Sequence, residues 1–149
     1  MKRKFAVFDI DGTFYRGSLY LDVVEKLIDK NLLDPAKVEK HLHVKDLWKS
    51  REHPNTYNDY VQATIDTVLS SLENLSPEII EEAAQSVVIE KQDYVYRYTR
   101  DLISSLKTQG YFLIAISGSQ REVVSKFIEK YAFDAFASTE WFRTPDGKR

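Results

Sequence analysis

Two short runs of uninterrupted apolar residues, widely separated in the chain, constrain the fold most. Residues 5–8 read Phe-Ala-Val-Phe and residues 111–116 read Tyr-Phe-Leu-Ile-Ala-Ile. Strands that are apolar at every position are typical of parallel sheets buried on both faces, whereas half-exposed strands alternate apolar and polar residues. Most of the chain between the two runs has helical patterns. The sequence therefore predicts an α/β protein in which a helical block follows the first strand.

Apolar spacing and start signals divide this block into helices. Asp34-Pro35 and Ser76-Pro77 each supply a helix N-cap followed by a proline at the first helical position. Helices are expected at residues 19–28, 34–48, 57–72, 76–88 and 94–107. After the second apolar run, the pattern predicts a helix at 123–131 and then a third strand or strand pair at 133–142.

These elements predict a partial Rossmann-like parallel sheet with an all-helical cap inserted after the first strand. We expect the incomplete α/β core to comprise residues 1–14 and 101–149, and the cap to comprise residues 15–100.

Composition excludes several classes of function. The 149 residues include 21 Lys and Arg against 23 Asp and Glu, and a net charge of −2 argues against a nucleic-acid partner. No apolar run approaches the roughly 18 residues that cross a membrane, and the first residues lack the apolar core of a signal peptide. The absence of cysteine excludes thiolate zinc sites and cysteine nucleophiles. We expect a cytoplasmic protein without a membrane partner.

Polar residues that could take part in catalysis or in binding a metal or an anion follow each apolar run. Asp9 and Asp11 are two positions apart, so extended backbone places both carboxylates on one face. Gly12 permits a sharp turn whose amides can face an anion. Ser117 and Gly118 supply a hydroxyl and an amide at the expected start of a helix, where anions bind readily. Ligand sites of parallel sheets lie at these carboxyl ends of the strands.

This combination favours a magnesium-dependent site for phosphoryl chemistry. Carboxylate and carbonyl oxygens are the ligands that Mg²⁺ prefers, and two acids in different environments can divide the nucleophile and proton-transfer roles. Simpler interpretations exist: an Asp-x-Asp pair often caps a turn, and Ser117 has the residue type of an ordinary helix cap. Ser119 is expected to be the cap of the following helix rather than a catalytic residue.

The residues also carry a family resemblance. Phe-Asp-Ile-Asp-Gly-Thr at 8–13 resembles the first signature motif of the haloacid dehalogenase-like hydrolase superfamily, and Ile-Ser-Gly-Ser at 116–119 resembles its second. The helical block between them is similar to the cap of the phosphoserine-phosphatase-like branch.

The resemblance implies a role for each matching residue. Asp9 would be the nucleophile that becomes an aspartyl phosphate and would also bind Mg²⁺. Asp11 would protonate the leaving oxygen and then activate water, while its main-chain carbonyl binds the metal. Ser117 and the Gly118 amide would hold the phosphoryl group, and Thr13 would brace the loop.

Two further motifs of the superfamily have no match in the chain. These are a lysine that neutralises the phosphoryl group and a late acidic pair that completes the Mg²⁺ site; Lys148 follows a Pro-Asp-Gly turn signal at 145–147. We expect a truncated form, or one that another chain completes, with weak or absent activity alone. The first strand is then expected to be an exposed sheet edge that favours self-association.

The resemblance leaves the function partly open. The leading interpretation is a phosphomonoesterase acting on a small phosphorylated metabolite; the alternatives are a phosphotransferase and a non-catalytic phosphate-binding module. The loop at 13–18 lacks the carboxylate with which phosphoserine-specific members meet the substrate ammonium. Arg16 is a candidate for binding an anionic leaving group, and Lys45, Arg51 and Tyr57 are candidate specificity residues of the cap.

Overall fold

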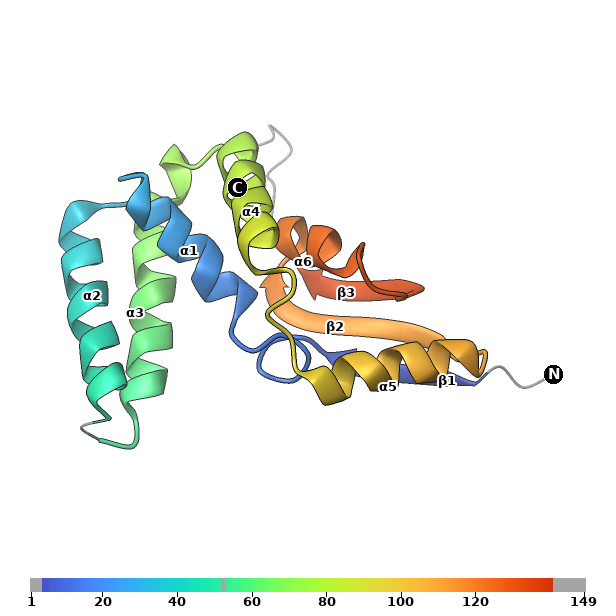
Figure 1. Ribbon diagram of the computed structural model, residues 1–149. Helices are drawn as coiled ribbons and strands as arrows, with labels where there is room; N and C mark the ends of the chain where they lie inside the picture. The colour runs from blue at the N-terminus through green and yellow to red at the C-terminus, as the bar shows by residue number, and fades with distance from the viewer. Residues whose placement is uncertain (1–3, 52, 141–149) are drawn as a thin grey trace.

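The core of the molecule is a parallel three-stranded sheet. The computed structural model describes residues 4–51 and 53–140. Strands β1 (Phe5–Asp9), β2 (Phe112–Gln120) and β3 (Ala135–Thr139) lie side by side in the order β1-β2-β3 (Figure 1). Phe5 is opposite Phe112, and Ile114 is opposite Ala135. The α/β class and the parallel sheet predicted from the two apolar runs are confirmed.

Helices fill the chain between β1 and β2. They are α1 (Leu19–Asp29), α2 (Pro35–Ser50), α3 (Thr56–Ser71), the short 3₁₀ helix η1 (Leu72–Asn74), α4 (Pro77–Lys91) and α5 (Arg97–Thr108). The side chains of Asp34 and Ser76 cap α2 and α4 as the sequence predicted, each ahead of a proline. Helix α5 ends just before Gly110, whose φ is +80°. Helix α6 (Arg121–Ile128) then connects β2 with β3.

Strand β2 is longer than the apolar pattern predicted. It continues through residues 117–120, which we expected to be a loop and a helix start. Its register with β3 shifts between Ile116 and Gln120, so the polar end of the strand is irregular. The predicted third strand is present as β3, while the end of its expected range and the turn signal at 145–147 lie outside the described residues.

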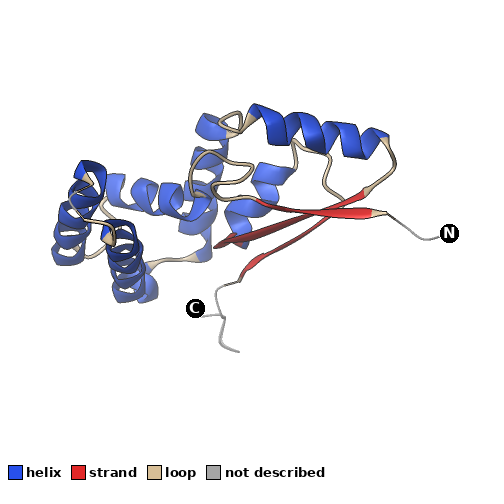
Figure 2. Cartoon of the chain, turned by 90° about the horizontal axis from the view of Figure 1, so that it is seen from below, coloured by secondary structure: helices blue, strands red, loops and turns tan. Residues whose placement is uncertain are grey.

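The two faces of the sheet differ in burial. Phe8, Leu113 and Ala115 are buried in one cluster with side chains of α5 and α6. On the opposite face, Phe5 is 66% exposed and Val7 is 48% exposed. In Figure 2, α5 lies along one side of the strands. Within the described residues, β1 pairs only with β2 and forms the edge of the sheet, as expected.

The helical insertion packs directly on the sheet domain. Helices α1 and α4 both contact α6, and Lys126 of α6 pairs with Glu81 of α4 at 2.7 Å. One hydrophobic cluster includes Val24 of α1, Val87 of α4 and Phe127 of α6. The insertion and the sheet therefore share a continuous core. No described helix is both long and apolar enough to cross a membrane.

The two segments that join the insertion to the sheet pair with each other. The N–H of Arg16 donates to the carbonyl of Tyr94 at 3.0 Å, and the N–H of Tyr96 donates to the carbonyl of Phe14 at 2.9 Å. The chain therefore leaves the sheet and returns to it at one place. The domain boundaries at residues 14–15 and 100–101 stay a prediction.

Candidate active site

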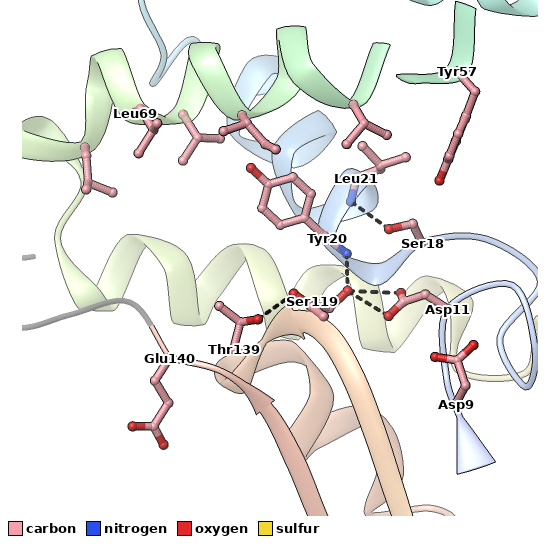
Figure 3. Close-up of a pocket in the computed structure, with 15 residues that line it drawn as sticks. Asp9, Asp11, Ser18, Tyr20, Leu21, Tyr57, Leu69, Ser119, Thr139 and Glu140 are labelled. Atoms are coloured by element: carbon pink, nitrogen blue, oxygen red, sulfur yellow. Dashed lines mark hydrogen bonds between the residues drawn. The ribbon is translucent and has the colours of Figure 1, made fainter. Parts of the chain in front are cut away.

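Two carboxylates at the carboxyl end of β1, those of Asp9 and Asp11, lie at a cavity of about 630 Å³ (Figure 3). This volume lies within the roughly 300–1,000 Å³ of typical ligand pockets. Asp9 and Asp11 line the cavity together with Gly118 and Ser119 from the polar end of β2. The cavity therefore lies at the carboxyl ends of two adjacent parallel strands, where the sequence placed a ligand site.

The Asp11 carboxylate is held by three donors. Its Oδ1 accepts the N–H of Leu19 at 2.6 Å, and its Oδ2 accepts the hydroxyl of Ser117. The Ser119 hydroxyl lies 3.0 Å from both carboxylate oxygens (Figure 3). Leu19 is the first residue of α1, so the Asp11 side chain lies at the N-terminus of that helix, where an acidic residue is favourable.

Ser119 has a different role from the one expected. We expected it to cap the following helix, but the N-cap of α6 is Gln120, and the Ser119 hydroxyl contacts Asp11 instead. Its oxygen also accepts the N–H of Tyr20 at 2.8 Å. The error came from ending the strand too early: in a strand that continues to Gln120, Ser117 and Ser119 share one side.

The loop after β1 is organised by its own main chain. The carbonyl of Ile10 accepts the N–H groups of residues 13–15 at 2.8–3.3 Å. Gly12 has a φ of +78°, a conformation that glycine adopts without strain. Its N–H donates to the carbonyls of Tyr15 and Gly17, so it closes the loop and is not directed at an anion as we expected.

The remaining predicted phosphate-binding residues also differ in placement. Thr13 donates its hydroxyl to Asp9 Oδ2 at 2.6 Å, in line with the bracing role expected of it. Ser117 is buried and its hydroxyl donates to Asp11, so it is not among the residues that line the cavity. Gly118 lines the cavity, although it lies within β2 rather than at the start of a helix.

The donor set suits a cation that keeps most of its water. Among residues 4–51 and 53–140, no group of three His, Cys, Asp or Glu is placed to hold a metal ion. Mg²⁺ is commonly bound through one or two carboxylates, with water and phosphate oxygens completing its shell. Asp9 offers a carboxylate in the cavity, whereas the Asp11 carboxylate is occupied by its three donors.

The sequence of the chain matches the model of a known protein family. The model of the haloacid dehalogenase-like hydrolases matches residues 4–147, almost the whole sequence. The chain belongs to the haloacid dehalogenase-like hydrolase family. The resemblance carried by the two sequence motifs is thus confirmed at the level of the family. No curated protein matches the chain.

Solved structures share the fold at low identity. A protein of unknown function from Bordetella pertussis Tohama I has a TM-score of 0.65 at 12% identity and covers 99% of this chain. A phosphoserine phosphohydrolase-like protein from Francisella tularensis subsp. tularensis SCHU S4 has a TM-score of 0.55 at 18% identity and covers 97%. A phosphoserine phosphatase solved as a phospho-aspartyl intermediate analogue has a TM-score of 0.53 at 18% identity and covers 99%.

The three matches also differ from this chain in length. The chain covers 65%, 62% and 61% of the three structures, respectively. At these identities the likeness establishes the fold of this chain and not its activity or substrate.

The wall of the cavity opposite the carboxylates is apolar. It is formed by α3, η1 and the start of α1, with the side chains of Tyr20, Leu21, Val61, Ile65, Val68, Leu69 and Leu72. Tyr20 is the most polar of these, and burial raises the pKa of its hydroxyl to about 12, so it is neutral at physiological pH. In Figure 3 this wall faces Asp11 and Ser119 across the cavity.

Of the candidate specificity residues, the structure places one at the cavity. Tyr57 lines it, at the start of α3. Arg16 lies elsewhere, with its guanidinium 4.8 Å from the ring centre of Tyr94. Lys45 donates to Glu25, and Arg51 lines a separate depression at the end of α2.

Proposed function

We propose that this protein is a Mg²⁺-dependent phosphomonoester hydrolase that acts on a small phosphorylated metabolite through an aspartyl phosphate at Asp9. The observation that carries the proposal is the shared cavity of Asp9 and Asp11 at the end of β1, in a member of a hydrolase family. The phosphoserine phosphatase of similar fold, solved as a phospho-aspartyl intermediate analogue, supports the same intermediate here.

In the first step, a carboxylate oxygen of Asp9 attacks phosphorus. The bond from phosphorus to the ester oxygen breaks, and protonated Asp11 gives its proton to that oxygen, which leaves as an alcohol. Thr13 donates a hydrogen bond to Asp9 Oδ2 and so orients the carboxylate, leaving Oδ1 as the attacking oxygen.

In the second step, Asp11 removes a proton from water. The water oxygen attacks phosphorus, the bond between Asp9 and phosphorus breaks, and inorganic phosphate leaves while Asp9 returns to a carboxylate. Asp11 ends protonated, ready for the next cycle. To reach the substrate, its carboxylate must exchange at least one of its present donors, Ser117 or Ser119, for the ester oxygen.

The metal would be held by the Asp9 carboxylate and the main-chain carbonyl of Asp11. When bound, Mg²⁺ offsets the negative charge of the phosphoryl oxygens. Asp9 and Asp11 both line the cavity, and their oxygens are of the type this cation prefers.

The test is hydrolysis of p-nitrophenyl phosphate with Mg²⁺ and with excess chelator. The missing lysine and late acidic pair predict that turnover by this chain is slow, and we expect Asp9→Asn to lower the metal-dependent part of it to background, because the nucleophile is removed. Asp29→Asn, at the exposed end of α1, removes a carboxylate outside the cavity and should leave the rate unchanged. Equal metal-independent rates in all three proteins would refute the proposal and favour a non-catalytic phosphate-binding module.

A further inference from the structure

The cavity has two chemically distinct ends. One end holds the carboxylates Asp9 and Asp11, which the proposed reaction uses on the phosphoryl group. The other end is formed mainly by hydrocarbon side chains of α3, η1 and α1, together with Tyr20 and Tyr57. In Figure 3 these side chains lie across the cavity from Asp11, so the organic group of a phosphoester bound at the carboxylates can extend toward them.

The helix α3 contributes an apolar face to the cavity that is separate from its packing face. Tyr60, Thr64 and Thr67 are buried in the insertion, on the side of the helix that packs against α2. Ile65 and Leu69, one helical turn apart, line the cavity instead. Leu69 is 62% exposed, so a large apolar side chain lies open on the cavity wall with room for an apolar neighbour.

Among the described residues, the cavity lining offers no cation to a negatively charged organic group. The charged residues among the described lining are Asp9, Asp11 and Glu140, and all are acidic. Glu140 is already paired with Arg121. No lysine, arginine or histidine of the described chain lines the cavity to meet a substrate carboxylate. Burying a carboxylate or an ammonium against this hydrocarbon wall without a partner is strongly unfavourable, whereas burying an apolar group is favourable.

We propose that the substrate is a phosphomonoester whose organic group is apolar, an alkyl or aryl phosphate rather than a phosphorylated amino acid. This inference rests on the proposed phosphatase function. The phosphoryl group binds beside Asp9, and the hydrocarbon group binds against Ile65 and Leu69 of α3 and Leu21 of α1.

The experiment compares ethyl, butyl and hexyl phosphate with O-phosphoserine as substrates in the presence of Mg²⁺. We expect kcat/KM to rise about fourfold for each methylene that the wall covers, and O-phosphoserine to be the poorest substrate. Leu69→Gln should lower kcat/KM for hexyl phosphate roughly five- to tenfold. Ile89→Gln replaces a 65% exposed isoleucine of α4 outside the cavity and should leave the whole series unchanged.

Binding of the matching alkylphosphonates, measured by calorimetry with Mg²⁺, separates this inference from the function. Affinity that rises with chain length, without turnover of any ester, would overturn the phosphatase function and retain the apolar site. Turnover that is independent of chain length, or fastest on O-phosphoserine, would retain the function and overturn the apolar substrate. A chain-length dependence that Leu69→Gln leaves intact would place the apolar group elsewhere and overturn the assignment to α3.

Discussion

At the scale of single residues, the candidate catalytic site also caps a helix. Asp11 and Ser119 accept the N–H groups of Leu19 and Tyr20, and Ser18 accepts that of Leu21. These are main-chain groups that the first turn of a helix cannot bond internally. Asp11, which is proposed for catalysis, therefore also fixes the start of α1 together with its neighbour Ser119, and substitutions at this site should change stability as well as activity.

Ser119→Ala is predicted to lower the free energy of unfolding by about 1–3 kcal/mol. The change leaves the N–H of Tyr20 without its acceptor and Asp11 without one of its donors, in a part of the molecule where Ser119 is buried. Urea titration measures the change. Ser104→Ala, at an exposed position of α5, should stay within about 0.5 kcal/mol of the unmodified protein. Equal effects of the two substitutions would show that the Ser119 bonds contribute nothing net.

At the scale of elements, one carboxylate joins the first three helices. Glu25 of α1 accepts hydrogen bonds from Lys45 of α2 and from Tyr60 of α3, and its Oε1 lies 3.2 Å from Nε2 of His41. Nδ1 of His41 in turn lies 3.2 Å from the hydroxyl of Thr64. Burial alone raises the pKa of Glu25, but the bonds from His41 and Lys45 outweigh it and lower the pKa to about 2, from an ordinary 4.5.

This network predicts acid-sensitive stability. Because the pKa of Glu25 is lower in the folded state, its ionised form stabilises the protein above pH 4.5, and that contribution is lost as the pH falls toward 2. Glu25→Gln should lower the free energy of unfolding by roughly 2–3 kcal/mol at pH 7. Urea titrations at pH 7 and pH 3 should show the difference between the two proteins shrinking at the lower pH.

The control for this prediction is Glu90→Gln. Glu90 pairs with Lys26 on the surface. Because exposed ion pairs contribute less than about 1 kcal/mol to stability, Glu90→Gln should lower the free energy of unfolding by less than that amount. A Glu25→Gln difference that is as large at pH 3 as at pH 7 would contradict the coupling of Glu25 ionisation to stability.

At the scale of the whole molecule, the shared hydrophobic core predicts cooperative unfolding. The cluster that contains Val24 and Phe127 crosses from the insertion to the sheet, so neither part buries its apolar surface alone. Trp48 of α2 stacks on Tyr60 at 5.0 Å and reports the insertion. In Trp141→Phe, the fluorescence of Trp48 and the far-UV circular dichroism should give the same urea midpoint. An earlier transition of Trp48 would instead show that the outer helices unfold independently.

The exposed sheet face predicts self-association. One face of the sheet carries exposed apolar side chains beside its β1 edge. They are Phe5 and Val7 of β1 and Ile116 of β2, each about half exposed or more. Edge strands of this kind pair with other chains unless charge prevents it. Sedimentation velocity should detect concentration-dependent association that Val7→Lys weakens. Leu42→Lys, which adds the same charge to an exposed site of α2, should not change it. A concentration-independent monomer would contradict the prediction.

The sequence by itself determined the strands, most helix starts and the two site carboxylates. These depend on short-range patterns: an unbroken apolar run, a cap followed by proline, and two acids at the period of a strand. They need no knowledge of distant residues, and the family motifs around Asp9 and Ser117 added the reaction class.

The tertiary structure alone decided how the polar groups are used. Ser117 donates to Asp11 across 106 positions, and Ser119 accepts from Tyr20 across 99, so no local pattern reveals either bond. The same holds for the apolar wall: the sequence of α3 does not show which of its sides is packed, and only the position of α2 shows that Thr64 and Thr67 are buried while Ile65 and Leu69 face the cavity. Local spacing predicts which residues share a face of a helix or strand. Packing against distant elements determines whether that face is buried against another element or lines the cavity.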